Sequence, residues 1–285
     1  MNGASPGRVR EFDFTQADFD SLRTLVKVRS GITLGEAKRE LVYGRVSRRL
    51  RALGLSAFGD YRKLLAGPGG EAEMIEFINA VTTNLTSFFR ESHHFDFLRD
   101  EYLRPRAADA RGTRRIRIWC AAASTGEEPY SIAMSVAEAI PDWERWDIRI
   151  LATDLDTNVL QTCVNGVYGE DRVRGMQKSR LERFFTPVVT DGRRQYRVNP
   201  ELASMITFRQ LNLMDALPMK GPIDIVFCRN VIIYFDKDTQ RSLFTRIAPL
   251  QRPGDVLILG HSESLLQVSD AWTLMGKTIY RKSGS

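Results

Sequence analysis

The chain has 285 residues and a mass of 32.4 kDa, which suits one domain of ordinary size together with a smaller one. Hydrophobic residues make up 43% of the sequence and charged residues 27%, which excludes disorder as the main state, and three separated cysteines without a C-x-x-C pair argue against a disulfide framework or a zinc site. The formal net charge of +6 indicates an acidic partner, which could be a nucleic acid, an anionic membrane or an acidic protein.

The N-terminal third is predicted to be helical. Its first residues lack the apolar core of a signal peptide and no apolar run reaches the length of a membrane span, so we expect a soluble cytoplasmic protein without direct membrane insertion. Helical spacing of apolar residues starts after Thr15, which could cap a helix that has Asp18 at its third position. Further helices are expected over 36–53, ending at Gly54, and over 56–66 and 71–80. The sequence therefore predicts a helical recognition domain over 1–84, followed by a linker helix and junction over 85–112.

From residue 113 onward, short β-rich runs alternate with helical ones, which is typical of a parallel sheet covered by helices. The predicted strands are 116–121, 148–153, 206–211, 223–228, 255–260 and 278–281, and the predicted crossover helices are 127–140, 156–164 and 238–250. The pair Asp191-Gly192 favours a tight hairpin turn, so a small antiparallel β insertion is expected over about 172–204. The sequence thus predicts an open α/β domain over 113–285 with this insertion.

Polar residues follow four of the predicted strands, where ligands of open α/β sheets bind. Asp154 ends the second strand, and an ionised carboxylate there could accept both hydroxyl protons of a ribose. Glu127 and Glu128 open the helix after the first strand, where they would repel phosphates and favour a cationic ligand, or would only complement the helix dipole. S-adenosylmethionine is a nucleoside with cationic groups and no phosphate, so it fits these residues.

Four motifs carry a resemblance to a known family. The motifs IWCAAASTGEEPYSIAM (118–134), NLTSFFRESHHF (84–95), CRNVIIYFD (228–236) and GHSESL (260–265) strongly resemble CheR, the chemotaxis receptor glutamate O-methyltransferases. The resemblance covers nearly the whole chain. It implies a class I S-adenosylmethionine-dependent methyltransferase fold, Rossmann-like with a mostly parallel sheet, with a small all-helical N-terminal domain and a small antiparallel β subdomain. It also implies transfer of a methyl group to glutamate side chains of methyl-accepting chemotaxis receptors, giving methyl esters and S-adenosylhomocysteine.

The resemblance further implies a set of cofactor contacts. Carried onto matching positions, they are Asn84, Thr86, Arg90, Glu128, Asp154, Asn212, Leu213, Arg229 and Asn230. The guanidinium of Arg90 offers a planar fork for the methionine carboxylate, and Asn212 with the backbone of Leu213 suits the adenine edge. Glu127 could exchange roles with Glu128, because sequence alone does not separate adjacent residues at a helix start. No metal ion is expected.

The implied reaction is an in-line displacement by a substrate carboxylate, which needs no strong base because glutamate is already ionised at neutral pH. We expect Tyr234 to orient that carboxylate through its hydroxyl group, or else to be a half-buried packing residue, and Arg90 to face it as a second catalytic residue. His93 and His94 are expected to serve in packing and capping, and His261 is expected to hold the loop after the fifth strand.

The helix over 36–53 carries a basic face that could bind the acidic methylation helices of a receptor or could simply be solvated. Its candidate substrate-binding residues are Arg45, Arg48, Arg49 and Arg51. The β subdomain shows no obvious tethering loop, so we expect direct substrate recognition by a monomer. The alternatives are a methyltransferase of the same fold that acts on another protein or on RNA, although no RNA-binding platform is visible, and a non-catalytic S-adenosylmethionine-binding regulator.

Overall fold

The structure is a computed structural model that describes residues 10–109 and 112–284 and separates into two compact units, Met1–Thr82 and Thr83–Ser285. The N-terminal residues considered for a signal peptide lie largely outside the described residues, as do residues 110–111 of the predicted linker. No described helix combines the length and apolar character needed to cross a membrane.

The first unit is helical, as predicted. It contains α1 (Gln16–Ser30), η1 (Glu36–Lys38), α2 (Arg39–Leu53), α3 (Phe58–Ala66) and α4 (Gly70–Val81). The predicted cap is confirmed, because the Thr15 hydroxyl accepts the Asp18 amide and the Asp18 carboxylate accepts the Thr15 amide, a reciprocal capping box. Helix α2 ends at Gly54, whose left-handed backbone (φ 66°) closes the last turn.

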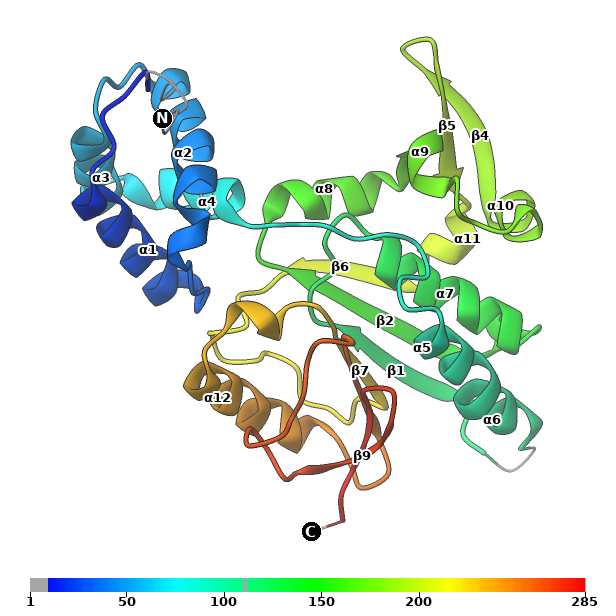
Figure 1. Ribbon diagram of the computed structural model, residues 1–285. Helices are drawn as coiled ribbons and strands as arrows, with labels where there is room; N and C mark the ends of the chain where they lie inside the picture. Colours follow the sequence, from blue (N-terminus) through cyan, green and yellow to red (C-terminus); the bar gives the residue numbers. More distant parts are fainter. Residues whose placement is uncertain (1–9, 110–111, 285) are drawn as a thin grey trace, which may run out of the picture. The chain divides into compact units, whose positions relative to one another are not determined.

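The second unit contains a mostly parallel seven-stranded sheet in the order β6-β2-β1-β7-β8-β10-β9 (Figure 1). Its strands are β1 (Arg115–Cys120), β2 (Asp147–Asp154), β6 (Ile206–Gln210), β7 (Ile225–Cys228), β8 (Val256–Leu259), β9 (Trp272–Gly276) and β10 (Ile279–Lys282). Strands β7 and β8 are buried throughout, as expected for a sheet covered on both faces. This is the class I methyltransferase fold expected from the sequence.

Helices connect and cover these strands. They are α5 (His93–Asp96), the π-helix η2 (Phe97–Leu103), α6 (Arg104–Ala108), α7 (Glu127–Ala139), η3 (Trp143–Arg145), α8 (Thr157–Asn165), η4 (Ile232–Tyr234), α12 (Lys237–Ile247) and η5 (Ala248–Leu250). The connections β1-α7-β2 and β7-α12-β8 leave the sheet centre in opposite directions, so right-handed crossovers place α7 and α12 on opposite faces. Strands β1 and β7 are neighbours, and the order reverses between them. Their carboxyl ends therefore mark the expected ligand position.

A smaller antiparallel sheet, in the order β3-β5-β4, projects from the large one (Figure 1). It consists of β3 (Val167–Gly169), β4 (Phe185–Thr190) and β5 (Arg193–Val198), with the short helices α9 (Glu170–Val173), α10 (Lys178–Phe184) and α11 (Pro200–Ala203). The predicted hairpin turn is present, with Asp191 and Gly192 both at positive φ.

Two strands were not predicted. Strand β3 has only three residues, too few to show a pattern, and it lies upstream of residue 172, where we expected the insertion to begin. Strand β9 pairs antiparallel with β10 at the sheet edge, and four of its five residues are exposed or half-buried, so it lacks the apolar run of a central strand.

Candidate active site

Asp154 is the last residue of β2 and lies beside the loop that joins β1 to α7, as expected for a ribose-binding acid. The amide of Ser124 donates to Asp154 Oδ2 at 2.8 Å, and the amide of Asp156 donates to Oδ1 at 3.0 Å. Burial raises the pKa of Asp154 to about 6. Each oxygen of this carboxylate keeps further lone-pair capacity, so it could still accept hydroxyl protons.

Asn84 is held at the carboxyl ends of β1 and β2 by hydrogen bonds. Its side-chain amide donates to Asp156 Oδ2 at 2.7 Å, and its carbonyl accepts from Ser124 Oγ at 2.9 Å. Asp156 also caps α8 by accepting from Asn158. The start of the 84–92 segment is therefore held beside Asp154.

Glu127 and Glu128, which the sequence does not distinguish, have different partners in the structure. Glu127 is fully buried, forms an ion pair with Arg172 of α9, and accepts from Thr125 Oγ1 at 2.6 Å. Glu128 instead accepts from Arg229, which follows β7, at 2.5 Å. Both carboxylates are therefore already paired with arginines, which weakens the argument that they attract a cationic ligand by their charge.

Close packing of the β1–α7 loop against β3 requires glycine at residue 126. It has a φ of 99°, and a Cβ atom there would lie 2.5 Å from the hydroxyl of Tyr168 on β3. The Tyr168 hydroxyl donates to the Thr125 carbonyl at 2.8 Å. The small β sheet thus contacts the β1–α7 loop directly. Any side chain at residue 126 would push this loop away from the small sheet.

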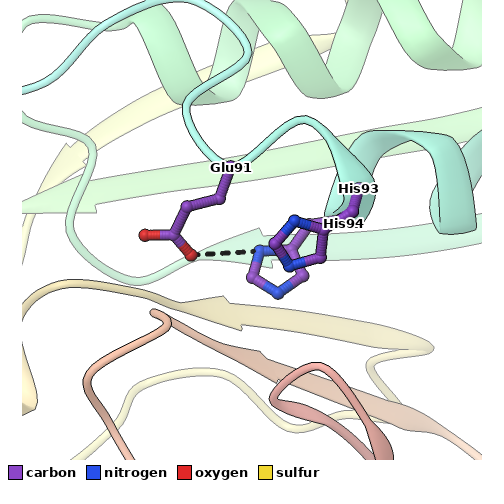
Figure 2. Close-up of side chains that lie close together, drawn as sticks. All are labelled: Glu91, His93 and His94. Atoms are coloured by element: carbon purple, nitrogen blue, oxygen red, sulfur yellow. Dashed lines mark ion pairs between the residues drawn. The ribbon is translucent and has the colours of Figure 1, made fainter.

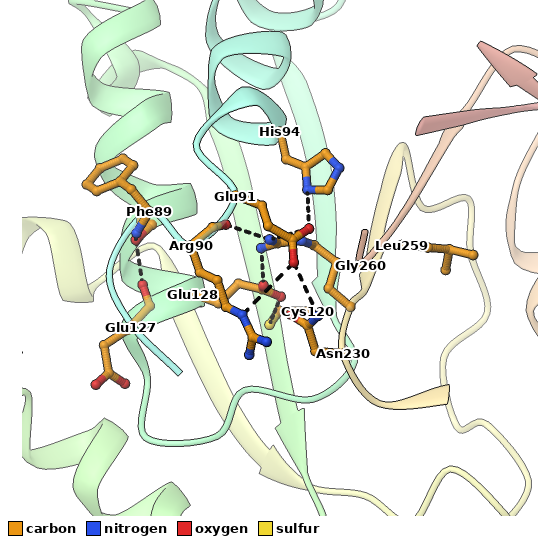
Figure 3. A network of polar contacts seen from close by, with 12 residues as sticks. Phe89, Arg90, Glu91, His94, Cys120, Glu127, Glu128, Asn230, Leu259 and Gly260 are labelled. Atoms are coloured by element: carbon orange, nitrogen blue, oxygen red, sulfur yellow. Dashed lines mark hydrogen bonds and ion pairs between the residues drawn. The ribbon is translucent and has the colours of Figure 1, made fainter. Parts of the chain in front are cut away.

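A buried charge cluster lies at the carboxyl ends of β1 and β7 (Figure 3). The side chain of Arg229 is 0% exposed; it contacts Glu128 at 2.5 Å and Glu91 Oε2 at 3.3 Å, and donates to the Arg90 carbonyl at 2.5 Å. Burial raises the pKa of Glu128, against the opposing effect of Arg229. Burial also works against ionisation of Glu91, yet the hydrogen bond from His261 and the charge of Arg229 lower its pKa to about 2. Four predicted residues, Arg90, Glu128, Arg229 and Asn230, therefore meet around Glu91.

Asn230 has a left-handed backbone, with a φ of 57°, and is held by the next loop. Its backbone amide donates to Glu263 Oε2 at 2.8 Å, and the backbone amides of Ile232 and Gly260 donate to the same carboxylate at 2.9 and 2.6 Å. A Cβ atom at Gly260 would lie 2.4 Å from Asn230 Nδ2. The carboxylate of Glu263 thus shapes the loop that carries Asn230.

The histidines lie near this cluster and have structural contacts. His94 is fully buried, and its Nε2 lies 2.9 Å from the Lys277 carbonyl. His261 uses its amide and Nδ1 to contact Glu91 at 3.0 and 2.9 Å. Possible metal-ligating atoms of Glu91, His93 and His94 lie within 4.8 Å of one another (Figure 2). However, the Glu91 oxygens already accept from His261 and Asn230 and face Arg229, which would compete with a cation for them.

The remaining predicted residues are Thr86 and Arg90 of the 84–92 segment, Asn212 and Leu213 after β6, and Tyr234 of η4. Among the described residues, the hydroxyls of Thr86 and Tyr234 have no hydrogen-bond partner, and both residues are half-buried. The Arg90 guanidinium donates to the Leu85 carbonyl at 2.9 Å. Asn212 and Leu213 follow β6, where Asn212 Oδ1 accepts the Met214 amide and the Leu213 carbonyl accepts from Arg246.

Most of the candidate substrate-binding arginines on α2 have partners within the first unit. Arg49 forms a two-point ion pair with Glu73, Arg51 pairs with Glu11, and Arg45 donates to the Ala80 carbonyl. In the described part of the chain, Arg48 is exposed and has no ion-pair partner. Arg48 is therefore the member of this group with the freest side chain.

Glu91, Asp156 and Glu263 were missed as site residues. Asp156 carries a local signal, because an aspartate just before a helix is a typical N-cap. Glu91 and Glu263 lie inside the quoted motifs, but their partners are far away in the chain: His261 is 170 residues from Glu91, and Asn230 is 33 residues from Glu263. Short-range patterns do not reveal such contacts.

A polar cavity of about 600 Å³ lies elsewhere in the second unit. It contains none of the predicted site residues, and it is lined by charged residues that include Asp96, Arg99, Arg104, Glu138, Arg180 and Arg183. Arg180 and Glu138 form a two-point ion pair in its wall.

Comparison with known proteins covers both units. The model of the CheR methyltransferase S-adenosylmethionine-binding domain matches residues 84–281, and the model of the CheR all-alpha domain matches residues 17–82. A chemotaxis protein methyltransferase of Escherichia coli is 41% identical over 94% of this chain and 92% of its own length. Chemotaxis protein methyltransferase 2 of Pseudomonas aeruginosa is 43% identical over 95% of each chain, and a probable chemotaxis protein methyltransferase of Rhizobium etli is 42% identical over 88% of this chain and 94% of its own.

Proposed function

The chain belongs to the CheR methyltransferase family and binds S-adenosylmethionine, and from that premise we propose that it methylates glutamate side chains on the cytoplasmic domains of methyl-accepting chemotaxis receptors. The observation that carries this proposal is that the family match spans both units, with relatives named chemotaxis protein methyltransferases that align over nearly their full length. The proposal includes a cytoplasmic location and a monomeric enzyme.

The site has the donors and acceptors that S-adenosylmethionine needs. Asp154 lies at the carboxyl end of β2, and we assign the ribose hydroxyls to it; Asn212 and Leu213 follow β6, and we assign the adenine edge to them. In the described structure, the Nε atom of buried Arg229 has no hydrogen-bond partner. A buried donor without a partner costs free energy, so an anionic ligand group such as the methionine carboxylate would be favoured there.

The remaining cofactor contacts come from the 84–92 segment and from α7. Thr86 offers a hydroxyl without a partner among the described residues, and Arg90 offers the rest of its guanidinium. Glu128 is favoured over Glu127 because it shares the charge cluster with Arg90 and Arg229, whereas Glu127 faces Arg172. Asn84 positions this segment through Asp156.

The transfer step forms a bond between a glutamate carboxylate oxygen and the methyl carbon. S-adenosylmethionine supplies that methyl on a sulfonium centre, and S-adenosylhomocysteine leaves with the electron pair of the broken carbon–sulfur bond. Because the substrate carboxylate is already ionised at neutral pH, the protein must orient and desolvate it rather than deprotonate it. We assign this orientation to Tyr234, whose hydroxyl has no other partner in the described structure, and to Arg90.

Recognition of the receptor is assigned to the helical unit. Its helix α2 presents Arg48 to solvent, and the overall charge of +6 favours encounter with an acidic methylation helix. Neighbouring Arg45, Arg49 and Arg51 have internal partners, so their share in binding is expected to be smaller.

The test is methyl transfer from methyl-labelled S-adenosylmethionine to receptor-containing membranes, with RNA offered in parallel. We expect label in the receptor band and its release as methanol by mild base, since carboxyl methyl esters hydrolyse readily. Base-stable label, or label in RNA alone, would contradict glutamate esterification. Binding of S-adenosylmethionine without any transfer would favour a non-catalytic regulator.

A further inference from the structure

Glu91 contacts groups from several separate segments of the second unit. Its Oε1 accepts from Asn230 Nδ2 at 3.2 Å and lies 2.9 Å from His261 Nδ1, while its Oε2 accepts the His261 amide at 3.0 Å. Arg229 and His94 lie 3.3 and 3.5 Å from Oε2. Glu91 therefore joins the 84–92 segment to the ends of β7 and β8 (Figure 3).

These contacts balance a buried cation. The guanidinium of Arg229 has no solvent exposure and faces two carboxylates, Glu91 and Glu128. A buried charge that loses a partner is strongly destabilised. If Glu91 became neutral, Arg229 would be balanced by Glu128 alone, so its guanidinium would be expected to shift toward α7 and away from the Arg90 carbonyl.

The backbone around Arg90 also depends on Glu91. Phe89 and Glu91 have φ angles of 52° and 58°, so two non-glycine residues in the left-handed region flank Arg90. Such conformations cost free energy and persist only where surrounding contacts impose them. The Phe89 amide donates to Ser131 Oγ at 2.9 Å on one side, and the Glu91 carboxylate is held on the other.

We propose that Glu91 is a positioning residue for cofactor binding: its carboxylate holds Arg229, Asn230 and the backbone of Arg90 in the arrangement that binds S-adenosylmethionine. The inference rests on the assignment, under the proposed function, of these three residues to the cofactor site. The experiment measures cofactor binding, so it does not depend on the receptor being the substrate.

Replacement of the carboxylate by an amide gives the first test. In Glu91→Gln, an NH₂ group would face donors from His261, Asn230 and Arg229, so the contacts would reorganise with little change in side-chain volume. We expect the Kd for S-adenosylmethionine, measured by calorimetry, to rise about 10- to 100-fold, as for loss of a charged hydrogen bond. Receptor KM should stay within about twofold at saturating cofactor.

A matched control is Glu101→Gln. Glu101 lies on η2 of the same unit, is exposed and has no partner among the described residues, so the variant makes the same charge change without touching the cluster. Its Kd should equal that of the wild type. A folded Glu91→Gln protein, judged by circular dichroism, with a Kd within twofold of wild type would overturn the proposal.

A milder variant decides the matter if Glu91→Gln fails to fold. The His261 side chain is 65% exposed, so His261→Ala removes one Glu91 contact with little loss of packing. We expect a Kd raised several-fold and an unchanged melting temperature. In a double-mutant cycle with Glu91→Gln, where both variants fold, the two effects should not add. An unchanged Kd in His261→Ala beside an unfolded Glu91→Gln would limit Glu91 to a role in stability.

Failure of receptor methylation by wild-type protein with normal cofactor affinity would overturn the proposed function and leave this inference standing.

Discussion

Asp154 is half-buried and His94 is fully buried, and removal from water favours the neutral form of each. Burial raises the pKa of Asp154 to about 6, whereas burial and the charge of Arg229 lower the pKa of His94 to about 4. Asp154 therefore makes the folded state less stable as pH rises from about 4 to 6, and His94 makes it less stable as pH falls from about 6.5 to 4. Because the two effects oppose each other in wild-type protein, variants are needed to separate them.

The Asp154 carboxylate predicts a pH dependence of cofactor affinity. If the ionised form accepts the ribose hydroxyls, affinity should fall about tenfold between pH 7 and pH 5, as protonation proceeds through a pKa of about 6. Asp154→Asn should bind more weakly at pH 7 and lose most of this dependence. Asp147→Asn, at the exposed start of the same strand, should behave like wild type. Calorimetric titrations at three pH values give the answer, and a flat wild-type profile would rule out an ionised carboxylate as the acceptor.

His94 predicts a pH dependence of stability. The folded protein must leave His94 neutral while the unfolded chain protonates it, so this residue alone lowers the free energy of unfolding by about 2 kcal/mol between pH 7 and pH 5. The variant His94→Gln, whose amide could still donate to the Lys277 carbonyl, should show a smaller pH difference in urea unfolding. His93→Gln serves as the neighbouring control. An equal pH difference in wild type and His94→Gln would contradict the assignment.

Secondary structure could be predicted where its cause is local, and the site only in part. Helix α1 was identified from Thr15 and Asp18, which lie three residues apart, and β7 and β8 from continuous apolar runs. Asp154 was found because a strand end is visible in the sequence. The positioning contacts of Glu91 and Glu263 were not found, because they depend on which distant loops the sheet order brings together.

Helix α2 shows the same limit on its basic face. The sequence places Arg48 and Arg49 side by side with equal charge, but the fold separates them. Arg49 donates to the carboxylate of Glu73, which also accepts from the buried Tyr61 hydroxyl at 2.7 Å, whereas Arg48 is exposed. Which arginine is structural is set by α4, and α2 alone does not reveal it.

This difference predicts opposite effects for two neighbouring substitutions. Arg49→Ala should lower the free energy of unfolding by about 3 kcal/mol, because it leaves the Glu73 carboxylate, only 9% exposed, without its cation. Arg48→Ala should leave stability within about 0.5 kcal/mol of wild type and reduce receptor methylation through a higher receptor KM. Thermal unfolding and steady-state kinetics measure the two effects. Equal destabilisation by both variants would show that the Arg49 pair is not structural.

At the scale of the whole molecule, the chain separates into two compact units. The predicted cofactor residues all lie from Asn84 onward, and a cluster of buried apolar residues in the second unit has members from Phe95 to Ile279. The first unit has its own apolar core, which includes Phe19, Leu22 and Val46. Each unit thus has the buried surface that an independently folding domain needs.

This division predicts that the fragment Thr83–Ser285 folds alone and binds S-adenosylmethionine with a Kd within about threefold of the full chain, because its sheet and candidate cofactor residues are all present. The same fragment should methylate receptor membranes at least tenfold more slowly if the helical unit supplies recognition. Calorimetry measures the first property and labelled methyl transfer the second, with the full chain as control. A folded fragment that methylates receptors at the full rate would show that recognition does not reside in residues 1–82. A folded fragment that does not bind S-adenosylmethionine would show that residues 1–82 contribute to the cofactor site.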